Sequence, residues 1–308
     1  MINFFNKFVY TEESLALNLS KQLKKKPEKY FYVLCLKILR EFYRFFQRFI
    51  TYPSLREFFK SCEKFFFKKL YVKKNLLAEG IKNNSYCEIS NIFSSKQIKE
   101  IKEFIKKKNL IGIYTGEKKF NLKSVPTNTS MGYLNTEDLL NCPHIIEGAN
   151  NNKLNNILKA YFQRTYKLDW IWCWWSFPQK NSVGPQIFHR DYENLNFVKV
   201  FVYLTDTDLK NGAHELIKSS HKSNHFYSKT RYAEKDIYKK FKKSDLVKIK
   251  GKAGKTFIEN TFAIHRGNAP IKKKRLILCY MFSIIPSSRS PKLPFFNSNI
   301  KKFSKDIK

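Results

Sequence analysis

A histidine and an aspartate stand two residues apart in the stretch QIFHRDYEN, as His189 and Asp191, in a chain that holds six histidines. Side chains at i and i+2 of a strand project from the same face, so we expect the pair to offer an imidazole nitrogen and a carboxylate oxygen to one point. His265, at the end of the strand-like run TFAIH, is a candidate third donor. Two histidines and one carboxylate that leave coordination positions open are typical of non-haem Fe(II) centres.

Arg275 is a second candidate binding residue. It lies ten residues past His265, at the start of the apolar run RLILCYMF. A guanidinium at the mouth of a barrel strand can bind a carboxylate through two parallel hydrogen bonds. We therefore expect Arg275 to hold an anionic group close to the predicted metal.

Strand-like runs that could position these residues begin at Trp170. The runs are β-branched and aromatic, are bounded by Gly, Pro, Asn or Asp, and read WIWCWWSF, NFVKVFVYL, KTFIENTFAIH and RLILCYMFSII. Several strands with long loops and few helices predict a sandwich or barrel rather than a parallel α/β sheet. Two helices are predicted before them: one that starts with a capping box formed by Ser94 and Gln97, and one from about Lys153 to Thr165.

The N-terminal part of the chain has a different pattern. From about residue 13 to 78 apolar and aromatic residues recur at helical spacing between basic ones, and Pro53 is predicted to separate two helices. This segment could lie on an anionic membrane surface, or its apolar face could pack on the main domain or a second subunit. We therefore predict three units: a basic helical extension over 1–85, a β domain over 86–286 and a basic irregular tail over 287–308.

The composition restricts the partners and the compartment. A formal net charge of +34 suits nucleic acid, an anionic membrane or an anionic substrate, although AT-rich coding DNA produces the same abundance of Lys, Asn, Ile and Phe whatever the function. No aromatic and basic groove pattern specific for nucleic acid is present, so we do not expect that partner. The six cysteines include no C-x-x-C pair, and neither a spanning apolar run nor a signal peptide is evident. We expect a cytoplasmic protein, soluble or peripheral at the membrane.

Four segments in order carry a family resemblance. They are FSSKQIKEIKEFI, QIFHRD, VYLTDTDLKNGAHELIKSSHK and IHRGNAPIKKKR. With them the chain from about residue 90 to 285 resembles the phytanoyl-CoA dioxygenase family of Fe(II)- and 2-oxoglutarate-dependent oxygenases. It departs from the family pattern at Ser219, where glycine is usual.

The resemblance implies a fold, two cofactors and a reaction. The fold is mainly β, a double-stranded β-helix (a cupin-like jelly roll of eight strands) with flanking helices. His189, Asp191 and His265 would hold Fe(II), while 2-oxoglutarate would chelate the iron and pair its distal carboxylate with Arg275. With O₂, the co-substrate would give succinate and carbon dioxide, and a C–H bond of a small-molecule substrate would be hydroxylated. Halogenating relatives lack the carboxylate, so Asp191 favours hydroxylation or desaturation.

Several other residues have open interpretations. Gln186 could hydrogen-bond near the co-substrate or support the strand entrance, and Asn268, which matches a family asparagine, could hold a turn or touch ligand. His221 and His225 have the i, i+4 spacing of zinc ligands, but no H-E-x-x-H accompanies them. The four tryptophans of the run WIWCWW are expected in the barrel core, with one lining the pocket.

The substrate is left open by the sequence. The basic segment 222–255 falls between the predicted metal-ligand strands and could act as a lid that attracts an anionic or lipid-like molecule, or be a solvated surface. Three alternatives remain: a β-helix that binds ligand without turnover, a basic adaptor whose residues 1–85 contact a membrane surface or nucleic acid, and an oxygenase that acts on a macromolecule.

Overall fold

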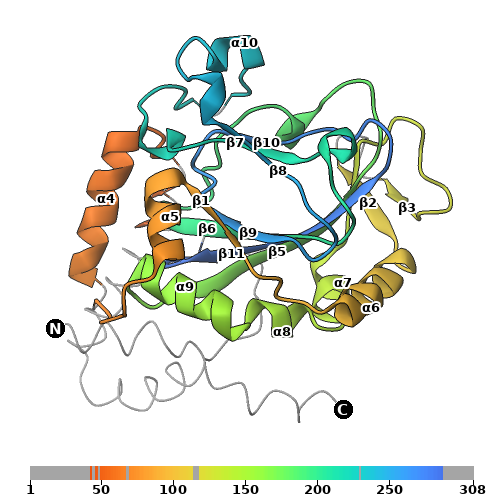
Figure 1. Ribbon diagram of the computed structural model, residues 1–308, viewed down its shortest axis with the longest axis horizontal. Helices are drawn as coiled ribbons and strands as arrows, with labels where there is room; N and C mark the ends of the chain where they lie inside the picture. Colours follow the sequence, from red (N-terminus) through yellow and green to blue (C-terminus); the bar gives the residue numbers. More distant parts are fainter. Residues whose placement is uncertain are drawn as a thin grey trace.

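The computed structural model describes residues 42–43, 46–47, 49–66, 69–113, 118–228 and 230–286, with only the backbone of 62–66. Most of the helical pattern expected over 13–78, and the tail over 287–308, therefore lie outside the described residues. The described chain forms two sheets that face one another, with several helices on the outer side of the larger sheet (Figure 1).

The two sheets are antiparallel throughout their assigned pairings. The larger has the strand order β1-β9-β6-β11-β5-β4-β2-β3 and the smaller β10-β7-β8. The strands are β1 (Tyr86–Ile89), β2 (Leu110–Ile113), β3 (Lys119–Phe120), β4 (Met131–Tyr133), β5 (Lys167–Ser176), β6 (Phe197–Tyr203), β7 (His214–Ile217), β8 (Leu246–Ile249), β9 (Thr256–Glu259), β10 (His265–Gly267) and β11 (Arg275–Ser283). This arrangement confirms the predicted mainly β, double-stranded β-helix fold.

Most of the helices lie on the outer side or at the edges of the larger sheet, whereas α10 lies beside the smaller sheet (Figure 1). They are α4 (Pro53–Phe66), α5 (Leu76–Asn84), α6 (Ser95–Lys106), α7 (Thr136–Leu140), α8 (Ile145–Ala149), α9 (Asn152–Phe162) and α10 (Glu234–Ile237). The predicted capping box is confirmed at α6, where the Ser94 hydroxyl accepts from the Gln97 amide and the Gln97 side chain accepts from the Ser94 amide. The second predicted helix is α9, which ends earlier than expected because Gln163 adopts the left-handed conformation.

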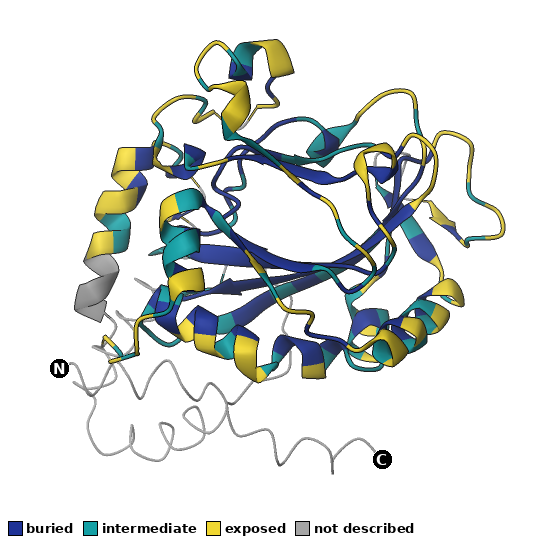
Figure 2. Cartoon of the chain, in the orientation of Figure 1, coloured by how far each residue is buried: buried dark blue, intermediate teal, exposed yellow. Residues whose placement is uncertain are grey.

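Alternation along β6 and β11 gives the larger sheet two different faces. Val198, Val200 and Val202 belong to the main hydrophobic cluster, which also contains the buried residues of α6 and α9. Phe201 and Tyr203 belong to a second cluster that includes Leu216 of the smaller sheet. Because successive side chains of a strand point to opposite faces, odd-numbered residues of β6 face the space between the sheets. Figure 2 shows that both sheets are largely buried.

The run KTFIENTFAIH is not the single strand that we predicted. Its first half is β9, which pairs with β6 in the larger sheet, whereas His265 begins β10, which pairs with β7 in the smaller sheet. Between them the chain turns at Asn260, whose side chain accepts a hydrogen bond from the Phe262 amide. The crossing coincides with three polar residues, Glu259, Asn260 and Thr261, which are as buried as the apolar residues on either side of them.

Helix α4 docks on the β domain through a buried arginine. Pro53 is its first residue, a position where the missing amide hydrogen costs nothing. The Arg56 guanidinium donates to the carbonyl oxygens of Asn194 and Leu195 and lies 4.1 Å from the Phe262 ring centre. Arg56 therefore holds this part of the N-terminal extension on the main domain, whereas Leu55 and Phe58 of the same helix are exposed. The division at residue 85 and the membrane contact of residues 1–85 stay predictions.

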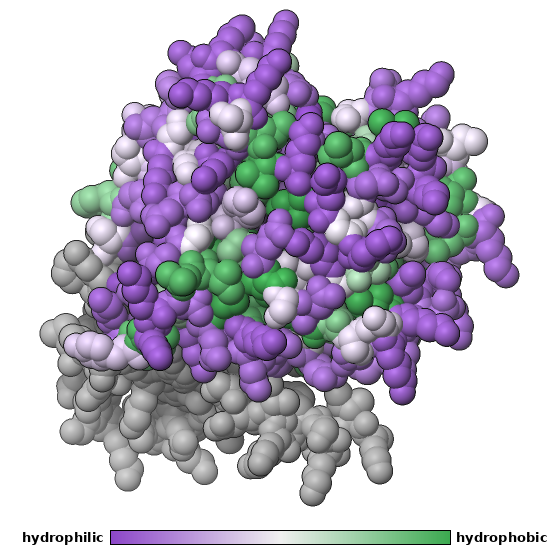
Figure 3. Space-filling view, viewed as in Figure 1, coloured by the Kyte–Doolittle hydropathy of each residue, from purple (hydrophilic) through white to green (hydrophobic). Residues whose placement is uncertain are grey.

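The surface is strongly hydrophilic on the face seen in Figure 3, where apolar side chains form scattered patches. This agrees with the 59 lysine and arginine residues of the sequence. Within the described ranges, no helix is long and apolar enough to cross a bilayer.

Candidate metal centre

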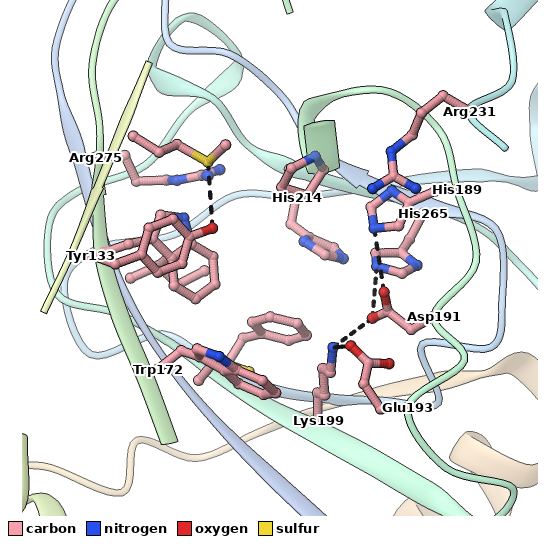
Figure 4. Close-up of a pocket in the computed structure, with 17 residues that line it drawn as sticks. Tyr133, Trp172, His189, Asp191, Glu193, Lys199, His214, Arg231, His265 and Arg275 are labelled. Carbon is pink, nitrogen blue, oxygen red and sulfur yellow. Dashed lines mark hydrogen bonds and ion pairs between the residues drawn. The ribbon is translucent and has the colours of Figure 1, made fainter. Parts of the chain in front are cut away.

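His189, Asp191 and His265 meet in the structure. One ligand atom from each lies within 4.8 Å of the others. His189 Nε2 is 3.4 Å from Asp191 Oδ1, and His265 Nε2 is 3.4 Å from Asp191 Oδ2 (Figure 4). All three side chains are mostly shielded from solvent. The two imidazole nitrogens and the carboxylate are the donor set that the sequence suggested.

The backbone that brings them together is not the strand that we expected around His189. His189 forms an isolated bridge to His265, in which each amide donates to the other's carbonyl oxygen at 3.0 and 2.9 Å. Asp191 lies in irregular chain, fixed by its amide donating to Thr261 O at 2.9 Å. The predicted i, i+2 convergence therefore arises from the crossing of two segments and not from one regular strand.

Backbone carbonyls set the tautomers of both histidines. His189 Nδ1 donates to Ile187 O at 2.8 Å, and His265 Nδ1 donates to Ala263 O at 2.9 Å. A ring whose Nδ1 carries the proton keeps its Nε2 lone pair when neutral. Both Nε2 atoms face Asp191, so the residues present fit a divalent metal.

Burial and neighbouring charges set the protonation states. Burial, with the nearby His265 ring, lowers the pKa of His189 to about 4. Burial alone would raise the pKa of Asp191, but Lys199 and then His265 outweigh it and hold that pKa well below its usual value. A neutral His189 and an ionised Asp191 are the states that a metal ligand requires.

A lysine that the sequence analysis did not single out contacts the triad. Lys199 Nζ donates to Asp191 Oδ2 at 2.7 Å and to Glu193 Oε1 at 3.0 Å, and it lies 4.9 Å from the Trp172 ring centre. The signal was present in NFVKVFVYL, where Lys199 is the one charged residue of an otherwise apolar strand. Its alternation with Val198 and Val200 places it on the face toward the other sheet.

The triad opens into a cavity of about 250 Å³ between the sheets. Aromatic walls come from Tyr133, Trp172, Trp174 and Phe201. Two tryptophans thus line the cavity where we expected one, while Trp175 is buried. Figure 4 shows the triad on one side of the cavity and Arg275 on the other, with His214 between them.

Arg275 is a buried cation that forms no ion pair with a carboxylate of the described residues. Its Nη1 donates to Gly212 O and its Nη2 to Ser176 Oγ at 3.1 Å, while Nε has no partner. Among the described residues no carboxylate lies within ion-pair distance of it. Gly267 leaves room for the guanidinium, since a β-carbon there would lie 3.2 Å from Nη2. An unpaired buried guanidinium that faces a cavity suits an anionic ligand.

A buried histidine–glutamate pair lies between the two ends of the cavity and was also missed. His214 Nε2 is 2.6 Å from Glu259 Oε2, and Glu259 Oε1 is 3.9 Å from His265 Nδ1. Burial lowers the pKa of His214, against the opposing effect of Glu259. The two residues come from β7 and β9, in different sheets, so sequence spacing gave no reason to join them.

Gln186 and Asn268 do not line this cavity. Gln186 Oε1 accepts from the Val183 amide at 2.9 Å, within a short 3₁₀ turn. Asn268 Nδ2 donates to Ala213 O at 3.1 Å and so ties down the turn that carries Gly212. Each residue thus has a structural contact, while Gln186 Nε2 is buried without a partner among the described residues, and a role of either side chain near the co-substrate stays a prediction.

His221 and His225 do not form a metal cluster. His221 is buried, with Nδ1 2.6 Å from Ser85 Oγ and Nε2 donating to Lys82 O at 3.0 Å, whereas His225 is exposed. In the part of the chain that the structure describes, His189, Asp191 and His265 are the one group of three or more potential ligands.

Comparison with known proteins assigns the family. The family model for phytanoyl-CoA dioxygenase (PhyH) matches residues 82–270. A comparison with curated protein sequences finds no significant match. Three similar solved structures are all of low sequence identity, so they support the fold alone.

The first is the non-haem α-ketoglutarate-dependent carbocyclase SnoK of nogalamycin biosynthesis, at 13% identity and a TM-score of 0.55, covering 73% of this chain and 94% of its own. The second is the epimerase SnoN with Fe³⁺, α-ketoglutarate and nogalamycin RO, at 13% identity and a TM-score of 0.51, covering 68% of this chain and 82% of its own. The third is HygX from Streptomyces hygroscopicus with nickel and 2-oxoglutarate, at 11% identity and a TM-score of 0.50, covering 70% of this chain and 89% of its own. The family match spans more than half of this chain, which therefore belongs to the phytanoyl-CoA dioxygenase family.

Proposed function

We propose that this protein is an Fe(II)- and 2-oxoglutarate-dependent dioxygenase that hydroxylates a small molecule. The observation that carries the proposal is the pairing of two features in one cavity: a His–Asp–His donor set, and a buried arginine without a carboxylate partner among the described residues. Family membership and the cofactors named for SnoN and HygX support it.

The proposed metal ligands are His189, Asp191 and His265. Their free Nε2 atoms and ionised carboxylate suit Fe(II), and three protein ligands leave positions for co-substrate and O₂. When bound, iron and 2-oxoglutarate would supply the activation of O₂ and the oxidation of a C–H bond. The protein's own part is to hold the ligands and to aim the substrate.

Arg275 is the proposed anchor of the distal carboxylate of 2-oxoglutarate. Its guanidinium is held by Gly212 O and Ser176 Oγ, so its orientation is fixed before ligand binds. Burial makes a charged hydrogen bond stronger than it would be in water. The aromatic walls, among them Trp174 and Phe201, would exclude water from the same space.

The proposed substrate carries an anionic group. Arg231, from the basic segment 222–255, lines the cavity beside His189, and its Nε donates to Gly184 O at 2.9 Å (Figure 4). No carboxylate of the described chain lies within ion-pair distance of its terminal nitrogens. Such a guanidinium at the cavity rim suits a carboxylate or phosphate, including that of an acyl thioester.

The first test is the visible absorption of metal-free protein titrated without oxygen by Fe(II) and then 2-oxoglutarate. A metal-to-ligand charge-transfer band should need both additions. It should vanish in His189→Ala and require more 2-oxoglutarate in Arg275→Ala, whereas Lys252→Ala, at an exposed residue, should match wild type. If folded wild-type protein shows no charge-transfer band, the proposal is wrong. The alternative of a protein that binds ligand without turnover would then be favoured.

Succinate release in a screen of anionic small molecules then tests turnover. SnoN is named as an epimerase and SnoK as a carbocyclase, so products should be analysed for mass and not only for added oxygen. A product heavier by one oxygen atom supports hydroxylation. A product of unchanged mass, or lighter by two hydrogens, would replace hydroxylation with a related oxidation on the same centre.

A further inference from the structure

Lys199 stands in an unusual place for a charged side chain. It is in the middle of β6, whose seven residues are all buried, and it is itself 8% exposed. Phe201 and Tyr203, on the same face of the strand, belong to the apolar cluster between the sheets. An ammonium is costly to bury without anionic partners, so its surroundings must stabilise the charge.

Three side chains contact the Lys199 ammonium. Asp191 and Glu193 each accept a hydrogen bond from it, and the Trp172 ring contributes a cation–π contact. These two hydrogen bonds to carboxylates and the ring contact favour the charged form of Lys199 in the wall of the cavity.

The same carboxylate serves Lys199 and the candidate metal centre. Asp191 Oδ2 is 2.7 Å from Lys199 Nζ and 3.4 Å from His265 Nε2, while Oδ1 is 3.4 Å from His189 Nε2. A divalent ion bound by the triad would lie close to the ammonium, and two positive charges at this range repel each other strongly in a partly desolvated site. The hydrogen bond also occupies one of the two oxygens that Asp191 could offer to a metal.

We propose that Lys199 is an internal counter-cation that competes with the metal for Asp191. By holding Asp191 Oδ2 it would stabilise the metal-free site and lower the affinity of the triad for a divalent ion. The inference rests on the proposed function only in that the triad binds a divalent metal. Lys199 is thus a positioning residue, since it acts on the metal through Asp191.

The test is the dissociation constant of Mn²⁺ measured by calorimetry on full-length protein without 2-oxoglutarate. Lys199→Met removes the charge and should lower this constant by about tenfold or more, because the repulsion is lost and Asp191 is freed. Lys199→Gln, which keeps a hydrogen-bond donor, should show the same direction and guards against a folding defect of the methionine variant. Lys199→Arg keeps the charge and should stay near wild type, as should Lys252→Met at the surface.

A purely structural lysine would give a different result, because its loss would loosen Asp191 and weaken Mn²⁺ binding. Unchanged or weaker binding in both neutral variants, with wild type binding normally, overturns the inference alone. If wild type does not bind Mn²⁺ and Lys199→Met does, the inference stands and the proposed function fails. If neither protein binds, both fail.

Discussion

The two ends of the cavity solve the problem of buried charge in opposite ways. At the triad end, the carboxylates of Asp191 and Glu193 share the ammonium of Lys199, and the histidine Nδ1 atoms are bonded to backbone carbonyls. At the opposite end, Arg275 has hydrogen bonds to a carbonyl and a hydroxyl oxygen and no carboxylate within the described chain. At one end the carboxylates have a cation of the protein beside them, whereas at the other end the cation has no carboxylate partner among the described residues.

This difference indicates that the two ends of the cavity contribute to different properties of the protein. A cluster held by internal ion pairs and backbone hydrogen bonds keeps its geometry in the absence of metal, so the ligand set is organised in advance. A lone buried guanidinium gains most when an anion enters, which turns its unfavourable burial into binding energy. The triad end should therefore contribute to the stability of the ligand-free protein, whereas the Arg275 end should contribute to affinity.

The largest expected difference between the two ends of the cavity is in the stability of two methionine variants. In the absence of ligands, Lys199→Met leaves two carboxylates without a buried cation and should lower the free energy of unfolding by about 3 kcal/mol. Arg275→Met removes an unpaired cation and should be neutral or stabilising, by about 1 kcal/mol. Urea unfolding with a chelator present measures both, with Lys252→Met as the surface control. Equal losses of unfolding free energy in the two variants would contradict the proposed difference between the two ends of the cavity.

The sequence was sufficient to find the residues that carry the most recognisable chemistry. His189, Asp191, His265 and Arg275 follow from residue type, spacing and their places beside apolar runs, and they meet in one cavity. Local capping chemistry also predicted the start of α6 at Ser94, because a capping box depends only on neighbours in the chain.

The remaining features depend on tertiary structure. Lys199 could be recognised as a charge within a buried strand, but its partners lie in irregular chain whose course no periodicity gives. His214 and Glu259 pair across two sheets. The crossing at Asn260 lies in a short polar stretch, Glu259 to Thr261, that is as buried as the apolar residues before and after it. Such contacts become predictable only when the course of the chain between the sheets is known.

The pH dependence of stability should also differ between variants at the two ends of the cavity. The pKa of His189 is about 4 in the folded state, below its unfolded value, so its contribution is present above about pH 6.5 and is lost as pH falls through 4. In metal-free protein His189→Gln should remove roughly 3 kcal/mol of this acid-induced loss. Arg275→Met should keep the wild-type slope, because a guanidinium does not titrate there. Parallel curves for wild type and His189→Gln between pH 6.5 and 4 would exclude this role.

The smallest expected effect concerns Asn268, which lies beside the Arg275 end without lining the cavity. Its side chain donates to Ala213 O at 3.1 Å, next to Gly212, whose carbonyl accepts from Arg275. Asn268→Ala removes one partly buried hydrogen bond and should lower the free energy of unfolding by about 1 kcal/mol. The dissociation constant for 2-oxoglutarate, measured with the metal present, should stay within about twofold of wild type, since a turn-holding residue leaves the guanidinium its other contacts. A large loss of 2-oxoglutarate affinity at unchanged stability would instead make Asn268 a ligand contact, and the anion would then be held by more than the single cation that distinguishes this end of the cavity.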